Sequence, residues 1–196
     1  KGGICEVYIA ANPVLDKRFA VKVLSRAFAN REDVAKRLEV EARALAQLAD
    51  HNGLVKIHTA GRDRVVGPYI VMELRSGTTL RDLLVRLRKL SVVQAVMIAI
   101  VLADITADFH VLDIVHRDLK PENIFLIPRG GNEDFVKVLD FGISKMREPE
   151  ETSPSLTRTG MAMGTPQYMS PEQAQGKMST DHRTDVYALG VILYRM

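Results

Sequence analysis

The stretch VHRDLKPENIF, residues 115–125, restricts the fold more than any other part of the chain. Four charged side chains and an asparagine stand between two apolar runs, and a proline fixes the turn. A solvated turn explains the charge. It does not explain why Asp118, Lys120 and Asn123 stand so close to the end of a strand that we expect to be buried. We therefore interpret this loop as a chemical site that a sheet presents.

A second polar position follows in VKVLDFGISK, where Asp140 ends an apolar strand just before a glycine. Alone, such an aspartate usually marks a turn. Together, Asn123 and Asp140 offer oxygen ligands of the kind that Mg²⁺ takes when it also binds substrate phosphates. Asp118 could accept a hydroxyl proton, and a lysine could hold phosphate oxygens. Phosphoryl transfer requires this combination of positioning and cations.

Two charges also stand on faces that the pattern expects to be apolar. The helix expected over about residues 31–50 carries a stripe of Val34, Leu38, Leu45 and Leu48, and Glu41 fills the remaining slot. Lys22 shares a face with Ala20 and Leu24 in the strand RFAVKVL. Each charge alone is explained by a side chain that reaches solvent. Together they predict a Lys–Glu pair that joins strand to helix, because a buried charge is costly without a partner.

The remaining patterns predict an α+β fold. Strands are expected in CEVYIA, RFAVKVL, LVKIHTAG and YIVMEL, followed by a break at Ser76-Gly77 and helices in LRDLLVRLRKL and SVVQAVMIAIVLADITADFHVL. Short strands are expected in IVH, NIFLI and VKVLD, and a polar stretch covers about residues 144–163. The composition indicates a small strand-rich lobe, a hinge near residues 73–77 and a larger helical lobe.

Bulk composition excludes several classes of function. The chain has 196 residues, is 46% hydrophobic and carries a formal charge of +3 without clustered cations, so we expect no nucleic acid partner. The single cysteine rules out an intrachain disulfide and suits a reducing compartment. The apolar run at residues 95–103 is too short to span a bilayer, so we expect no membrane segment. Both ends interrupt a motif, and we expect the chain to be part of a longer protein.

The chain begins KGGICEVYIA, which suits either a hairpin turn or the second half of a glycine-rich phosphate loop. The order of KGGICEVY, AVKV, Glu41, HRDLKPEN, DFG, GTPQYMSPE and DVYALG resembles the eukaryotic-type protein kinases over essentially the whole chain. HRDLKPEN and GTPQYMSPEQA resemble the serine/threonine branch and its bacterial members. The resemblance implies a bilobal protein-kinase-like fold, with an antiparallel-sheet N-lobe and one main helix over 1–74. A partial, mainly helical C-lobe would cover 75–196.

The resemblance also implies roles for single residues. Lys22 would hold the α- and β-phosphates of ATP and be positioned by Glu41, and Asp118 would be the catalytic base. Lys120 would steady the γ-phosphate, Thr165 would orient the base and the acceptor, and Asp185 would anchor the catalytic loop. Asn123 and Asp140 would hold Mg²⁺ or Mn²⁺. The nucleotide would meet Gly2, Gly3, Val7, Ala20, the gatekeeper Met72, the hinge Glu73 to Arg75 with Leu74, and Phe125.

Regulation is implied at Arg117, which resembles the arginine that receives a phosphorylated activation loop. Thr157 and Thr159 are the candidate phosphorylation sites. Two positions depart from the family pattern: Cys5 stands at the third loop glycine, and Asp113 stands where glycine is expected before IVHRD. Cys5 is either a mild replacement or a reactive thiol.

The function that follows is a protein serine/threonine kinase that transfers the γ-phosphate of ATP to protein hydroxyls. A pseudokinase or scaffold that binds nucleotide or partners without catalysis is the main alternative, and a small-molecule phosphotransferase of related fold is another. A tyrosine-specific kinase is disfavoured by the lysine in HRDLK. Protein substrates, a homodimer that phosphorylates itself in trans, and a cytoplasmic location of the catalytic part are expected.

Overall fold

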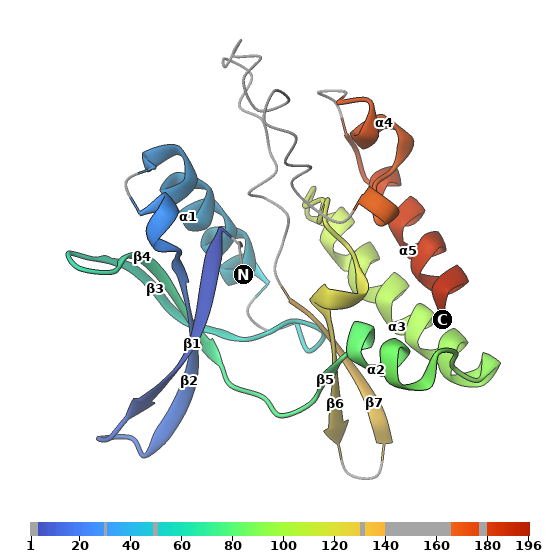
Figure 1. The fold of residues 1–196 in the computed structure, drawn as a ribbon, viewed down its shortest axis with the longest axis horizontal. Helices are drawn as coiled ribbons and strands as arrows, with labels where there is room; N and C mark the ends of the chain where they lie inside the picture. The colour runs from blue at the N-terminus through green and yellow to red at the C-terminus, as the bar shows by residue number, and fades with distance from the viewer. Residues whose placement is uncertain (1–3, 30, 49–50, 130–131, 140–165, 177–179) are drawn as a thin grey trace. The chain divides into compact units, whose positions relative to one another are not determined.

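The computed structural model of the 196-residue chain describes residues 4–29, 31–48, 51–129, 132–139, 166–176 and 180–196. The chain divides into two compact units, residues 1–76 and residues 77–196 (Figure 1). The division follows the break at Ser76-Gly77, where strand patterning gives way to helical patterning.

The first unit is built on a four-stranded antiparallel sheet with the order β1-β2-β4-β3. Its strands are β1 (Cys5–Asn12), β2 (Lys17–Leu24), β3 (Ile57–Asp63) and β4 (Gly67–Glu73). Asn12 closes the turn after β1, because its Oδ1 accepts hydrogen bonds from the amides of Val14 and Leu15. The chain leaves this turn through Asp16, which has a positive φ of 46°.

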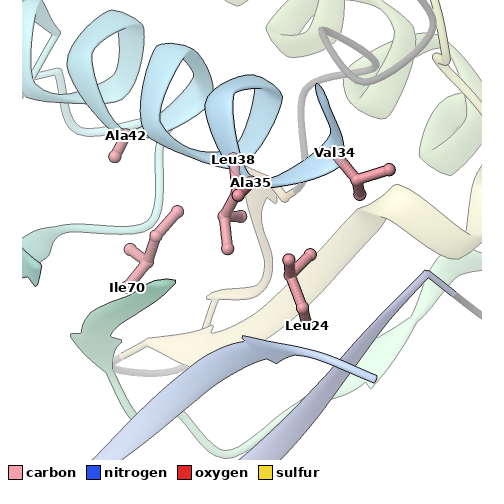
Figure 2. Close-up of a cluster of buried hydrophobic side chains, with 6 residues drawn as sticks. All are labelled: Leu24, Val34, Ala35, Leu38, Ala42 and Ile70. Atoms are coloured by element: carbon pink, nitrogen blue, oxygen red, sulfur yellow. The ribbon is translucent and has the colours of Figure 1, made fainter. Parts of the chain in front are cut away.

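Helix α1 (Glu32–Gln47) packs against β3 and β4 and closes the core of the first unit. A short 3₁₀ turn, Arg26–Phe28, leads into it. The predicted stripe of the helix is largely buried, and Ala35 and Ala42 are buried beside it. Figure 2 shows this core, in which side chains from α1, β2 and β4 meet: Leu24, Val34, Ala35, Leu38, Ala42 and Ile70.

The second unit contains the helices α2 (Leu80–Leu87), α3 (Val92–Val111), α4 (Pro171–Ala174) and α5 (Arg183–Arg195). Polar side chains fix where three of them begin. Thr79 caps α2, while Ser91 and Ser170 form capping boxes with Gln94 and Gln173. α3 packs against both α5 and β7.

A small antiparallel sheet of β5 (Thr78–Thr79), β6 (Ile124–Arg129) and β7 (Asn132–Val138) completes the second unit. The 3₁₀ turn Pro121–Asn123 leads directly into β6. Gly77 lies against this sheet so closely that a Cβ there would stand 2.2 Å from the carbonyl oxygen of Leu126. Glycine is therefore required at this position for a steric reason.

The strand predicted for IVH, residues 114–116, is wrong, because these residues form no strand in the structure. α3 ends immediately before them in a Schellman motif: the amide of Ile114 donates to the carbonyl of Phe109, and that of Asp113 to the carbonyl of His110. Asp113 has a φ of 56°, in the left-handed region that aspartate tolerates better than most residues. The departure from glycine noted in the sequence is thus accommodated.

Helix α3 is long and apolar enough to cross a membrane by length and composition, and 33% of its most apolar window is buried. Core helices of soluble proteins pass the same test. Its buried face carries Ile98, Leu102, Ile105 and Phe109 against the rest of the second unit, while Val92, Val93 and Ile100 are exposed. The absence of a membrane segment therefore stays a prediction.

Candidate functional site

Lys22 and Glu41 form a buried ion pair in the first unit. The distance between Lys22 Nζ and Glu41 Oε1 is 2.8 Å, and the two side chains are 7% and 3% exposed. Lys22 lies in the middle of the sheet, opposite Val7 of β1 and Ile70 of β4, so the ammonium leaves an apolar strand face toward α1. The predicted Lys–Glu pair is confirmed. Such burial is costly unless each charge meets the other in good geometry.

The loop predicted to carry the chemistry brings Asp118, Lys120 and Asn123 together in the second unit. Lys120 Nζ lies 2.7 Å from Asp118 Oδ2, and both side chains are partly buried. Asn123 Nδ2 donates to the carbonyl oxygen of Asp118 at 2.9 Å. The turn itself closes when the amide of Asn123 donates to the carbonyl of Lys120. The proline at position 121 starts this turn, since it supplies a fixed φ and needs no amide partner.

Asp185 of α5 holds the backbone of this loop through hydrogen bonds. Its side chain is fully buried and accepts from the backbone amides of His116 and Arg117, each at 2.8 Å, and its Oδ2 also lies 2.9 Å from His110 Nε2. His116 is itself fully buried, and its Nδ1 accepts from the amide of Asp118 at 3.2 Å. The contribution of His110 was missed. A histidine in the last turn of a helix with no other basic side chain was the signal.

A second contact to the same loop comes from Gln173 of α4. Its Nε2 donates to the carbonyl of Arg117 at 2.8 Å, a contact that the sequence did not predict. Close by, Ser170 Oγ lies 3.3 Å from Thr184 Oγ1, which donates to Glu172 Oε1 at 3.0 Å. The pKa of Glu172 is lowered by hydrogen bonds that its carboxylate accepts from its own backbone amide and from the side chains of Ser170 and Thr184. The start of α4 is thus tied both to α5 and to the loop that carries Arg117 and Asp118.

Arg117 is held in an unusual conformation, with a φ of 63°. Its Nη2 reaches the carbonyl of Thr180 at 3.5 Å, and its buried Nε has no hydrogen-bond partner among the residues that the structure describes. A small pocket lies beside it, and burial raises the pKa of the Tyr168 hydroxyl at its edge. The pocket is lined by Arg117, Asp118, Tyr168, Met169, Gln173 and Asp185, among others.

The residues predicted to meet the nucleotide lie mostly on the first unit. Ala20 is buried opposite Met72 of β4, and Val7 of β1 is exposed. Leu74 follows β4 and is partly buried. Glu73, which ends β4, is fixed by its neighbours: its amide donates to the carbonyl of Lys56, and its carboxylate accepts from the Lys56 amide and from Arg75 Nε. Phe125 lies on β6 in the second unit.

Several predicted residues lie outside the described part of the chain: Gly2, Gly3, Asp140, Thr157, Thr159 and Thr165. Cys5 is described. It begins β1 opposite Leu24 and packs against the core cluster of the first unit.

The described donors suit a magnesium nucleotide. Asn123 is buried, its amide nitrogen donates to the carbonyl of Asp118, and its side-chain carbonyl oxygen is an acceptor of the type that a hard cation takes. Lys22 supplies a buried ammonium of the sign that phosphate oxygens require. Among the described residues, no group of three or more His, Cys, Asp or Glu side chains could hold a metal ion.

Comparison with known proteins identifies the family. The chain matches the protein kinase domain family over residues 1–196. The chain belongs to the protein kinase family. Among curated relatives, this kinase chain is 40% identical over 196 residues to serine/threonine-protein kinase pkn3 of Myxococcus xanthus, covering all of the chain and 36% of that protein. It is 38% identical to PknA of Mycobacterium tuberculosis, covering 98% of the chain and 43% of that protein.

Solved structures give the same fold. The kinase chain aligns with the crystal structure of the M. tuberculosis PknI kinase domain with a TM-score of 0.71 and 24% identity. That alignment covers 97% of the chain and 66% of the PknI chain. The predicted α+β protein-kinase fold and the predicted likeness to bacterial serine/threonine kinases are confirmed. The chain spans less than half the length of these curated relatives.

Proposed function

We propose that the protein is an ATP-dependent protein serine/threonine kinase and that this chain carries its catalytic core. The observation that carries the proposal is the cluster of Asp118, Lys120 and Asn123 on one buttressed loop. The buried Lys22–Glu41 pair supports it, because a charge is seldom kept at a buried position without a use. The relatives at 36–40% identity are named as serine/threonine-protein kinases.

In the proposed reaction, the acceptor hydroxyl oxygen forms a bond to the γ-phosphorus of ATP, and the bond between that phosphorus and the β,γ-bridging oxygen breaks. Asp118 orients the hydroxyl and takes its proton, while Lys120 balances charge beside it. Lys22 holds phosphate oxygens, with Glu41 keeping its ammonium in place. Asn123 and Asp140 would hold a magnesium ion, which would supply positive charge beside the phosphates.

The nucleotide contacts follow the resemblance. We assign the adenine to Val7, Ala20, Met72 and Leu74 of the first unit and Phe125 of the second. Glu73 contributes through its backbone, and Gly2 and Gly3 contact the phosphates. Thr165 would orient Asp118 and the acceptor hydroxyl. The buried Ala20 and the fixed conformation of Glu73 support an ordered binding surface on β2 and β4.

Regulation is assigned to Arg117. Its buried Nε, which has no partner among the described residues, suits a phosphate oxygen. We assign that phosphate to Thr157 or Thr159 and expect it to arise by transfer between two copies of the protein. The kinase core would act in the cytoplasm, where ATP and protein substrates are available.

The pseudokinase alternative predicts nucleotide binding without transfer. No observation favours it, since Lys22, Asp118 and Asn123 are all present. Lys22 forms an ion pair with Glu41, and Asp118 forms one with Lys120.

The test is phosphate transfer by the full-length protein, supplied with ATP, Mg²⁺ and a generic protein substrate, followed by identification of the phosphorylated amino acids. We expect phosphoserine and phosphothreonine, and a loss of at least about a thousandfold in Asp118→Asn. Asp113→Asn is the matched control, since it makes the same change on an exposed aspartate whose left-handed backbone asparagine also adopts. Nucleotide binding without transfer by the wild type would contradict the proposal.

A further inference from the structure

Gln173 joins two segments that lie 56 residues apart in the sequence. Its Nε2 donates to the carbonyl of Arg117 at 2.8 Å, and Arg117 immediately precedes the proposed base Asp118. The other end of the same amide is also engaged, since Oε1 accepts from the amide of Ser170 at 3.0 Å. Because both ends of the amide have partners, the rotation of the side chain is fixed.

The carbonyl that Gln173 contacts belongs to a residue held against its backbone preference. Arg117 has a φ of 63°, and arginine has no side-chain group that eases this conformation in the way that asparagine or aspartate does. Asp185 holds the amide of Arg117 at 2.8 Å, and Gln173 holds its carbonyl. The conformation is thus clamped at both polar groups of one residue, from α5 and from α4.

The clamp from α4 is itself anchored. Ser170 is fully buried, its hydroxyl lies 3.3 Å from that of Thr184, and Thr184 adjoins Asp185 in the chain. Gln173 and Asp185 therefore act on Arg117 from one connected group of side chains. Arg117, Asp118 and Gln173 also line one pocket with Met169, which belongs to the segment that leads into α4.

We propose that Gln173 is a positioning residue for phosphoryl transfer. By donating to the carbonyl of Arg117, it keeps the backbone of Arg117 left-handed, and this sets the direction in which Asp118 leaves the loop. It also links the order of the segment before α4 to the placement of the base. This inference rests on the proposed kinase function.

The two roles of the Gln173 amide can be separated by substitution in the full-length protein. Gln173→Glu keeps an oxygen for the Ser170 amide but replaces the donor with an acceptor that repels the Arg117 carbonyl. Gln173→Lys keeps a donor for that carbonyl and loses the acceptor. Gln175→Glu is the matched control, because it adds the same charge on an exposed glutamine at the end of α4.

The measurement is kcat and KM for ATP in phosphate transfer, together with the melting temperature. We expect Gln173→Glu to lower kcat about tenfold with KM for ATP unchanged, the size of effect that one neutral hydrogen bond supplies. Gln173→Lys should stay within about threefold of the wild type, since the contact to the Arg117 carbonyl is the one that matters. The melting temperature of Gln173→Glu should fall by no more than that of Gln173→Lys, so the larger loss of kcat in Gln173→Glu does not follow from stability.

Two results would overturn the inference while the wild type remains active. One is a kcat for Gln173→Glu equal to that of Gln175→Glu. The other is an equal loss of kcat in Gln173→Glu and Gln173→Lys that parallels a lower melting temperature, because Gln173 would then only cap α4. An inactive wild type would instead overturn the kinase proposal on which the inference rests.

Discussion

The two units place their functional charges in different ways. In the first unit, Lys22 of β2 is held by another charge, Glu41 of α1, with 2.8 Å between Lys22 Nζ and Glu41 Oε1. In the second unit, Asp118 lies on a loop whose backbone is held at His116, Arg117 and Asn123 by hydrogen bonds. The first arrangement depends on two side chains, and the second depends on the path of the chain.

This difference predicts which substitutions each unit tolerates. A buried ion pair fails when one partner is removed, yet it can be replaced as a pair by apolar side chains. A loop held through its amides and carbonyls is sensitive to whatever binds or crowds its backbone, including its own His116 and Asn123 side chains. Stability measurements on matched variants can therefore break or sharpen the comparison.

The largest effect is expected for Glu41→Leu, which leaves the buried ammonium of Lys22 without its carboxylate. We expect a loss of about 4 kcal/mol in the free energy of unfolding, measured by urea titration. The double variant Lys22→Met/Glu41→Leu should return to the wild-type value or above it, because both desolvated charges are gone. A double variant as unstable as the single one would show that the pair is not the source of the cost.

The next effect is expected for Asp185→Asn in the second unit. Its carboxylate accepts from His116, Arg117 and His110, and the amide that replaces one oxygen would face donors. We expect a loss of about 3 kcal/mol in the free energy of unfolding, because buried donors lose a charged acceptor. Asp181→Asn, on a half-exposed side chain whose pKa Arg183 lowers to about 2, should leave stability near that of the wild type. Equal losses of stability in the two variants would show that the Asp185 carboxylate does not anchor the loop.

Gly77→Ala tests backbone crowding in the second unit. The added Cβ would meet the carbonyl oxygen of Leu126 at 2.2 Å, so β6 or the chain before β5 must shift. We expect a loss of about 2 kcal/mol in the free energy of unfolding, measured by thermal unfolding, which is typical of overpacking against backbone. Gly176→Ala is the comparison, since it strains a φ of +67° but meets nothing within 4 Å, and it should cost less. A larger loss at Gly176 would contradict the close approach.

The smallest effect is expected for Asp113→Gly. Asp113 has a φ of 56° at the end of α3, in the Schellman motif that leads into the loop that carries Asp118. Glycine adopts this conformation without strain. We expect a gain of about 0.5 kcal/mol in the free energy of unfolding, measured from the melting curve. Asp113→Ala should shift it the opposite way. A destabilised glycine variant would show that the Asp113 side chain contributes more than the backbone does.

Sequence patterns predicted the charge-held site better than the backbone-held one. Lys22 and Glu41 interrupt two apolar stripes, and the two interruptions taken together are enough to predict the pair. The strand predicted at residues 114–116 was wrong because Asp185, about 70 residues further along the chain, satisfies the backbone there instead of a neighbouring strand. Such long-range acceptors leave no periodic trace. Gln173 does belong to a local sequence pattern, the Ser-x-x-Gln capping box. That pattern predicts where a helix starts, but it does not predict a contact to the loop.

The most direct test of this division of labour is the dissociation constant for ATP with Mg²⁺, measured by calorimetry on Lys22→Met and Asp118→Asn in the full-length protein. If Lys22 holds phosphate and Asp118 serves the acceptor hydroxyl, Lys22→Met should raise the dissociation constant about tenfold or more, the loss expected for a charge-assisted hydrogen bond. Asp118→Asn should leave it within about threefold of the wild type. The reverse pattern, in which Asp118→Asn loses ATP binding and Lys22→Met keeps it, would contradict the account.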